Sequence, residues 1–160
     1  MKNILILISL FLTTFYSHAQ SSFLYNKAEQ RLIKIIGRNI RVSREVGETQ
    51  ASFIFSLRFV INEDGRLDTV MSSKLFPKAL ADVVLDKSLY NGVEWKEILK
   101  NNPRMAIILP VTVTSSDYDG LKAFGLKGII EQFNFPGVSQ SSMECYLMQP
   151  FSIVYSPPIK

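Results

Sequence analysis

The amino-acid sequence predicts an α+β fold, in which a small antiparallel β-sheet packs against two or three helices. The first observation is residues 52–72, where apolar and polar residues alternate on both sides of a glycine-containing turn, as in the two strands of a hairpin. The second is another strand-like run at residues 105–113. The third is the helical spacing of apolar residues in residues 23–37 and 77–91.

Residues 1–19 are predicted to be a signal peptide. Lys2 supplies the positive charge, residues 4–16 form an apolar run, and Ser17 and Ala19 are the small residues of a cleavage site. The apolar run is shorter than the stretch of about 20 residues that spans a bilayer. An uncleaved N-terminal anchor is the alternative. We therefore expect an exported mature chain that begins at Gln20, is periplasmic or secreted, and keeps no stable membrane anchor.

The composition excludes several kinds of site from the mature chain. The only histidine, His18, lies in the predicted signal peptide, and Cys145 is the only cysteine. Ser-His-Asp and Cys-His catalysis, an intramolecular disulfide and a structural zinc site are therefore not expected, and we predict no metal or cofactor. The net charge is +4, and the densest basic stretch, residues 31–44, alternates with Ile, Leu and Val. This pattern favours a solvated helix face over a nucleic-acid or membrane patch.

The N-terminal half of the predicted domain begins with a helix at residues 23–37, for which Gly37 is a plausible end. A polar connecting segment follows, and then the first strand of the hairpin. One face of that strand carries the apolar residues Phe53, Phe55, Leu57, Phe59 and Ile61. Residues 62–65 form the turn, in which Gly65 can take a positive φ. Residues 66–72 run back, and the aromatic face is expected to be core.

The C-terminal half begins with a helix predicted at residues 77–91 and a short mixed segment around Trp95. The strand at residues 105–113 is apolar on both faces for most of its length, and Pro110 predicts an edge position or a bulge because it cannot donate a ladder hydrogen bond. A helix at residues 121–133 and a strand at residues 146–155 are expected after it. The whole of residues 20–160, about 140 residues, suits a single domain.

Residues 40–114 resemble the C-terminal domain of TonB and its relatives, the TonB-C family. That family has a strand, an Asn-x-Asp-Gly hairpin, a helix with alanine and apolar residues, a tryptophan and a closing strand that ends in Pro-Val. The corresponding segments here are residues 53–61, residues 62–67, Ala79 with Leu80, Trp95 and residues 110–113. The resemblance implies a TonB-C-like core at residues 40–114, with residues 115–160 as a C-terminal extension of the same domain.

In TonB, this domain pairs an edge strand with a segment of an outer-membrane receptor. The resemblance therefore implies an exported, non-catalytic module that binds an envelope or outer-membrane protein by β-strand addition. We expect the pairing edge at residues 105–113, with Ile107, Leu109 and Val111 as the alternate side chains that contact the partner. In the alternative, residues 146–155 cover this edge.

Two other functions stay open. The first is that of a structural or adaptor component of an envelope assembly, with residues 115–160 as the interface. The second of these functions is that of a small secreted hydrolase that uses two carboxylates. The candidate carboxylates are Glu63 and Asp64 in the turn, or Asp82 and Asp86 on the second helix. These carboxylates are also typical of ordinary solvated surface charges.

Overall fold

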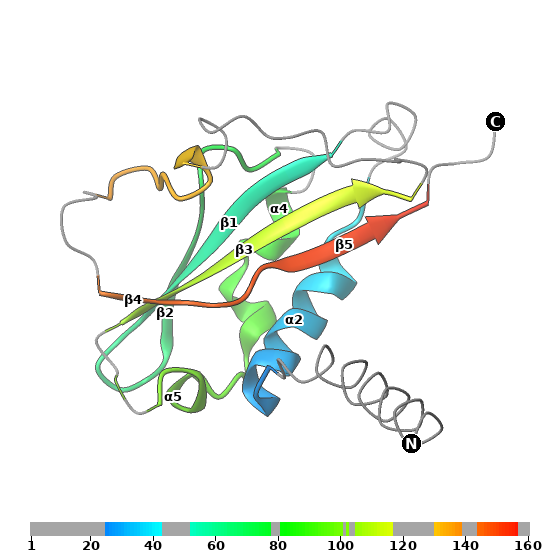
Figure 1. The fold of residues 1–160 in the computed structure, drawn as a ribbon. Helices are drawn as coiled ribbons and strands as arrows, with labels where there is room; N and C mark the ends of the chain where they lie inside the picture. Colours follow the sequence, from blue (N-terminus) through cyan, green and yellow to red (C-terminus); the bar gives the residue numbers. More distant parts are fainter. Residues whose placement is uncertain are drawn as a thin grey trace, which may run out of the picture.

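The computed structural model describes residues 25–42, 52–77, 81–100, 102, 105–116, 130–138 and 144–156. In this part of the chain, a twisted five-stranded sheet carries its helices on one face (Figure 1). The strands are β1 (Phe53–Ile61), β2 (Leu67–Ser72), β3 (Ala106–Ser115), β4 (Cys145–Leu147) and β5 (Phe151–Tyr155). The helical elements are α2 (Lys27–Asn39), α4 (Ala81–Val84), the 3₁₀ turn η2 (Lys87–Tyr90) and α5 (Trp95–Ile98). The predicted signal peptide lies outside the described residues, as do residues 121–129 of the predicted third helix.

The predicted hairpin is confirmed. Strands β1 and β2 pair in antiparallel fashion, and the turn between them is closed by side-chain and backbone hydrogen bonds from Asn62. Its Oδ1 accepts from the Arg66 amide at 2.8 Å, and its carbonyl accepts from the Gly65 amide at 2.9 Å. Gly65 has φ of +78°, so the turn needs a residue without a Cβ there. The ladder shifts register where it rejoins, because Asp68 has no partner on β1.

Strand β3 is confirmed as a strand, but the prediction of a purely antiparallel sheet is wrong. On one side β3 pairs antiparallel with β1, and on the other it pairs in parallel with β4 and β5. The sheet order is β2-β1-β3-β4, with β5 also beside β3, so β3 is an interior strand. The prediction that residues 105–113 form an edge is therefore wrong too. A strand with apolar residues on both faces is typical of an interior position.

Pro110 occupies a position in β3 where no amide donor is needed toward β1. Its partner on β1 is Ser56. The amide of Ser56 donates to Ser73 Oγ at 3.0 Å, and the carbonyl of Ser56 accepts from the Ser73 amide at 2.9 Å. The backbone groups of Ser56 thus point to β2, and the Pro110 nitrogen in this antiparallel pair points away from β1, toward the outer strands.

The outer strand is interrupted beside Pro110. Ile108 pairs with Leu147, whereas Val111 pairs with Phe151. Four steps along the outer strand (147 to 151) therefore match three along β3 (108 to 111), which is a bulge. The expected strand at residues 146–155 is divided into β4 and β5 for this reason, and of the two roles predicted for Pro110 the bulge is the one observed.

Helix α2 packs across the sheet and begins with a capping box. The side chain of Asn26 accepts from the Glu29 amide at 2.8 Å, and the Asn26 amide donates to Glu29 Oε2 at 2.7 Å. The prediction that Gly37 ends this helix is wrong, since the helix continues to Asn39. A Cβ at Gly37 would come within 3.3 Å of the Phe151 ring. Gly37 therefore allows β5 to lie close to α2.

The predicted helix at residues 77–91 forms only in part. The chain makes α4 and then, after a break, η2. The carboxylate of Asp86 accepts from the Ser88 amide at 2.8 Å and from Ser88 Oγ at 2.6 Å. An aspartate that caps a new turn in this way competes with continuation of the preceding helix. Of the predicted apolar stripe, Val84 is fully buried, whereas Val83 is 50% exposed.

The C-terminal strands are tied to α2 by tyrosines. Tyr146 on β4 donates its hydroxyl to Glu29 Oε1 at 2.8 Å. Tyr25, just before α2, donates to the Pro150 carbonyl at 3.1 Å. The core between the sheet and the helices includes residues of α2, β1, η2, α5 and β3 and of the link between β4 and β5: Leu32, Ile36, Phe55, Leu57, Phe59, Tyr90, Trp95, Ile98, Ile107, Leu109, Val111 and Met148. Residues of the predicted extension are thus part of the same core.

Candidate functional site

The three residues predicted to contact a partner are core residues. Ile107, Leu109 and Val111 all have 0% of their side chains exposed, and they lie in the cluster between the sheet and the helices. The edge of β3 on which their assigned role depended is occupied by β4 and β5. The alternative, in which residues 146–155 cover that edge, is confirmed.

The outer side of β2 is an open edge of the sheet. Strand β2 lies at the end of the strand order. Because Ser73 faces β1 through its hydrogen bonds with Ser56, the alternation of an antiparallel ladder turns the amides and carbonyls of Ser72 and Val70 outward. Within the described residues, no hydrogen bond from another segment reaches these groups.

Among the residues that the structure describes, β5 forms a second open edge. The Tyr155 carbonyl accepts from the Ser116 amide at 2.8 Å, so Tyr155 faces β3. By the same alternation, the backbone groups of Ser152 and Val154 point outward. The Val154 side chain is exposed on the face opposite α2. The two edges thus offer similar backbone groups, and they differ in what lies beside them.

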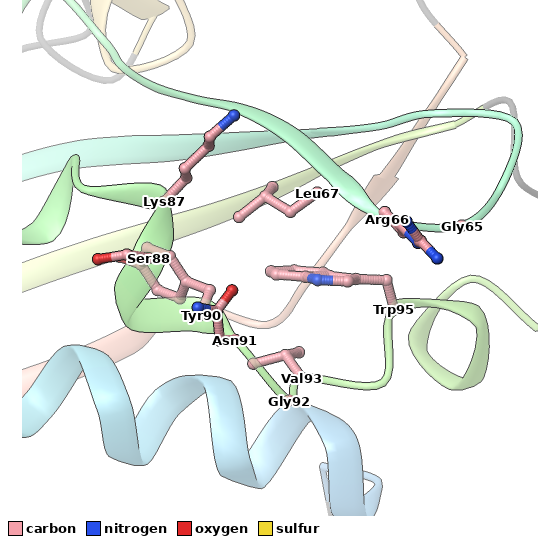
Figure 2. Close-up of a pocket in the computed structure, with 10 residues that line it drawn as sticks. All are labelled: Gly65, Arg66, Leu67, Lys87, Ser88, Tyr90, Asn91, Gly92, Val93 and Trp95. Carbon is pink, nitrogen blue, oxygen red and sulfur yellow. The ribbon is translucent and has the colours of Figure 1, made fainter.

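A pocket of about 410 Å³ lies beside the β2 edge. Ten residues line it, and we call it the Trp95 pocket: Gly65, Arg66, Leu67, Lys87, Ser88, Tyr90, Asn91, Gly92, Val93 and Trp95. Figure 2 shows Leu67 projecting from β2 toward the indole ring of Trp95, with Val93 on the other side of that ring. The pocket therefore lies between the first residues of β2 and the segment that includes η2.

The floor of the Trp95 pocket is aromatic and rigidly held. The Trp95 ring is 5.3 Å from the ring of Phe59, and Tyr90 packs edge-on to Phe59 at 5.1 Å. The Tyr90 hydroxyl donates to the Val84 carbonyl at 2.6 Å. Burial, and then the charge of Asp86, raises the pKa of Tyr90 well above its usual range. Tyr90 therefore stays neutral and acts as a fixed wall.

The rim of the pocket is cationic. Arg66 and Lys87 line it directly, and Lys87 rises from η2 toward β2 in Figure 2. Two more cations lie against the glycines of the rim. Lys96 packs on Gly65, and the Arg31 guanidinium lies 2.8 Å from where a Cβ of Gly92 would be. No carboxylate in the described part of the chain forms an ion pair with any of the four.

The carboxylates considered for hydrolysis do not line this pocket. Glu63 and Asp64 are exposed in the hairpin turn, and the side chain of Asp82 lies outside what the structure describes. Hydrogen bonds from the Ser88 hydroxyl and amide hold the pKa of Asp86 below its usual range. No group of three or more His, Cys, Asp or Glu side chains suited to a metal ion occurs among the described residues.

Comparison of the chain with known protein families, with characterised proteins and with solved structures finds no match. The likeness to the TonB-C family therefore rests on the sequence motifs alone. Over the residues that the structure describes, no helix is long and apolar enough to cross a membrane.

Sequence reasoning singled out Trp95 but missed the pocket around it. The residues of the rim come from the hairpin, α2, η2 and α5, so no local pattern connects them. The spacing of Asp86 and Ser88 is the one available signal, because it is typical of a cap that starts a new turn at η2.

Proposed function

We propose that this protein is an exported, non-catalytic protein-binding module that takes up a strand of an envelope protein at the β2 edge. The observation that supports it is the outward backbone of Val70 and Ser72, on a strand whose first residue, Leu67, lines the Trp95 pocket. Strand addition needs main-chain hydrogen bonds for affinity and nearby pockets for side-chain selectivity. Both are present at β2.

The composition of the edge supports the same assignment. Exposed edge strands are usually protected by charges, prolines or a covering segment. The stretch of β2 from Thr69 to Ser72 carries no charge and no proline. Asp68 and Lys74 flank it, so the unprotected part is short. A partner strand of a few residues would fit it.

The compartment and the partner follow from the sequence. The predicted signal peptide and the motifs that resemble TonB-C support an exported chain with an envelope or outer-membrane protein as partner. Mass spectrometry of the protein from its native cells tests the first part: we expect a mature N-terminus at Gln20. An intact Met1 or Lys2 in the extracted protein would contradict it.

Photo-crosslinking in cells tests the binding site. A photoreactive amino acid at Thr69, exposed on β2, should crosslink to an envelope protein. The substitution Ser72→Pro should abolish the crosslink, because it removes an outward amide without breaking a bond to β1. The expected loss of stability is below about 1 kcal/mol, since Pro is tolerated at edges.

The matched control lies on the other edge. Ser152→Pro removes an outward amide of β5, and it should leave the crosslink from Thr69 unchanged. If instead Ser152→Pro abolishes the crosslink while Ser72→Pro does not, the binding edge is β5 and the proposal is wrong. Crosslinking that survives both substitutions would exclude strand addition.

A further inference from the structure

The Trp95 pocket combines an apolar interior with a cationic rim, and this combination indicates what it binds. The half-buried Leu67 and the accessible part of Trp95 offer an apolar surface inside it, and the buried Val93 and Tyr90 lie behind them. Trp95 is 5% exposed and Tyr90 1% exposed, so their rings are fixed by the core behind them. The volume of about 410 Å³ falls in the range typical of small-ligand sites.

We propose that the Trp95 pocket binds an organic carboxylate that carries an aromatic or branched apolar group. The apolar group lies against Trp95 and Leu67, and the carboxylate lies at the rim beside Arg66, with Lys87 at the other end of the pocket. The pocket can fill whether or not a strand pairs with β2, so this inference goes beyond strand addition.

The charges around the pocket support an anion. Arg31, Arg66, Lys87 and Lys96 gather at the rim, and within the described residues none has a carboxylate partner. Four acidic residues adjoin lining residues in the sequence: Asp64 and Glu94 are exposed, and Asp68 and Asp86 are engaged within their own segments. Asp86 accepts from Ser88, as described above, and Asp68 Oδ2 accepts from Thr69 Oγ1 at 3.1 Å.

The hydrogen-bond donors that we assign to the anion are side chains of the rim. Phosphates are commonly bound by free amides at the start of a helix. At η2 that position is filled, because the Ser88 amide already donates to the Asp86 carboxylate. The remaining donors are side chains, and an arginine guanidinium matches a planar carboxylate through two parallel hydrogen bonds.

The only tryptophan of the chain lies in the pocket, so its fluorescence reports binding directly. The mature protein is titrated with phenylpropionate, with the alcohol phenylpropanol and with the amine phenylpropylamine, with excitation where the phenyl group does not absorb. These probes share one apolar body and differ in charge. Methyl NMR signals of Leu67 and Val93 locate the binding.

We expect phenylpropionate to bind with a dissociation constant on the order of 1 mM, as for other ligands of this size. The alcohol should bind at least about fivefold more weakly, and the amine more weakly still, because each loses the attraction of the rim. The double variant Arg66→Gln with Lys87→Gln should bind phenylpropionate about tenfold more weakly.

The control variant combines Lys34→Gln with Lys74→Gln, two exposed lysines outside the pocket. It changes the net charge equally and should bind phenylpropionate as the wild type does. Equal binding of the acid and the alcohol would overturn the proposal, as would an equal loss in both double variants. Absence of any change in Trp95 emission and in both methyl signals would also overturn it.

Two further probes identify the source of the carboxylate. A short peptide that ends in a free Phe carboxylate is compared with its amide. If the free-acid peptide binds more tightly than phenylpropionate and the amide does not, the ligand is a peptide C-terminus. If only phenylpropionate binds, the ligand is a free small acid. Both results uphold the site. Because Ser72→Pro blocks the edge without altering the pocket lining, failure here and failure of strand addition are distinguishable.

Discussion

The hydrogen bond between Glu29 and Tyr146 predicts a measurable coupling between α2 and the C-terminal strands. Glu29 is 6% exposed and accepts at 2.7 Å from the Asn26 amide and at 2.8 Å from the Tyr146 hydroxyl. The test is a double-mutant cycle of Glu29→Ala and Tyr146→Phe. It asks whether the C-terminal segment stabilises the domain through this contact.

The expected magnitudes follow from the contacts. Tyr146→Phe removes one charge-assisted bond, and since the tyrosine is only half buried we take the lower end of the usual range, about 1.5 kcal/mol. Glu29→Ala removes that bond and the capping box, for about 3 kcal/mol in total. In the Glu29→Ala background Tyr146→Phe should cost almost nothing, so the coupling free energy is about 1.5 kcal/mol.

Urea unfolding of the mature chain, followed by Trp95 emission, measures all four free energies. The control cycle pairs Glu29→Ala with Tyr90→Phe, whose hydroxyl bonds to Val84 instead. That pair should be additive within about 0.5 kcal/mol. If the Glu29 and Tyr146 effects are additive to the same degree, the hydrogen bond contributes no coupling and the reasoning is refuted.

Three other predictions concern the core, the α2–β5 contact and high pH. In the same urea assay, Leu109→Ala should lower the free energy of unfolding by about 2–5 kcal/mol. Thr69→Ala, at an exposed position, should change it by less than about 0.5 kcal/mol. Gly37→Ala should change the free energy of unfolding by less than about 1 kcal/mol, because the higher helix propensity of alanine offsets the crowding of Phe151. Gly37→Leu should lower the free energy of unfolding by about 1–3 kcal/mol. Equal effects of the two substitutions would contradict the close contact between α2 and β5. The raised pKa of Tyr90 means that the folded state holds this proton more tightly than the unfolded state. Stability should therefore fall as pH rises above about 10, and Tyr90→Phe should flatten this fall in urea curves recorded at increasing pH; an unchanged slope would contradict it.

The hairpin and β3 could be predicted because their signals are local. The alternation from Phe53 to Ile61, the turn with Gly65 and the apolar run of β3 each lie within one short window of sequence. The parallel pairing of β5 with β3 could not be predicted in the same way. Parallel neighbours are joined by long crossovers, and no short sequence pattern specifies which side of β3 they take.

The candidate site was predicted wrongly for a related reason. Pro110 indicates that one amide is absent from the ladder, but it does not indicate whether solvent or a bulged strand lies opposite. The break between α4 and η2 was missed because apolar periodicity outweighed the capping by Asp86 and Ser88. The pocket that this break helps to form depends on Trp95 and Lys87 from different turns, which only the tertiary structure brings together.

The position of β5 beside β3 has a consequence for the order in which the protein can be assembled during synthesis. Strand β3 ends at Ser115, and the two strands on its other side, β4 and β5, begin only at Cys145 and Phe151. A nascent chain that has emerged as far as β3 therefore lacks the residues that cover this side of the sheet. Because contacts so distant in sequence form late and slowly, the chain should stay incompletely folded until its last strand is available.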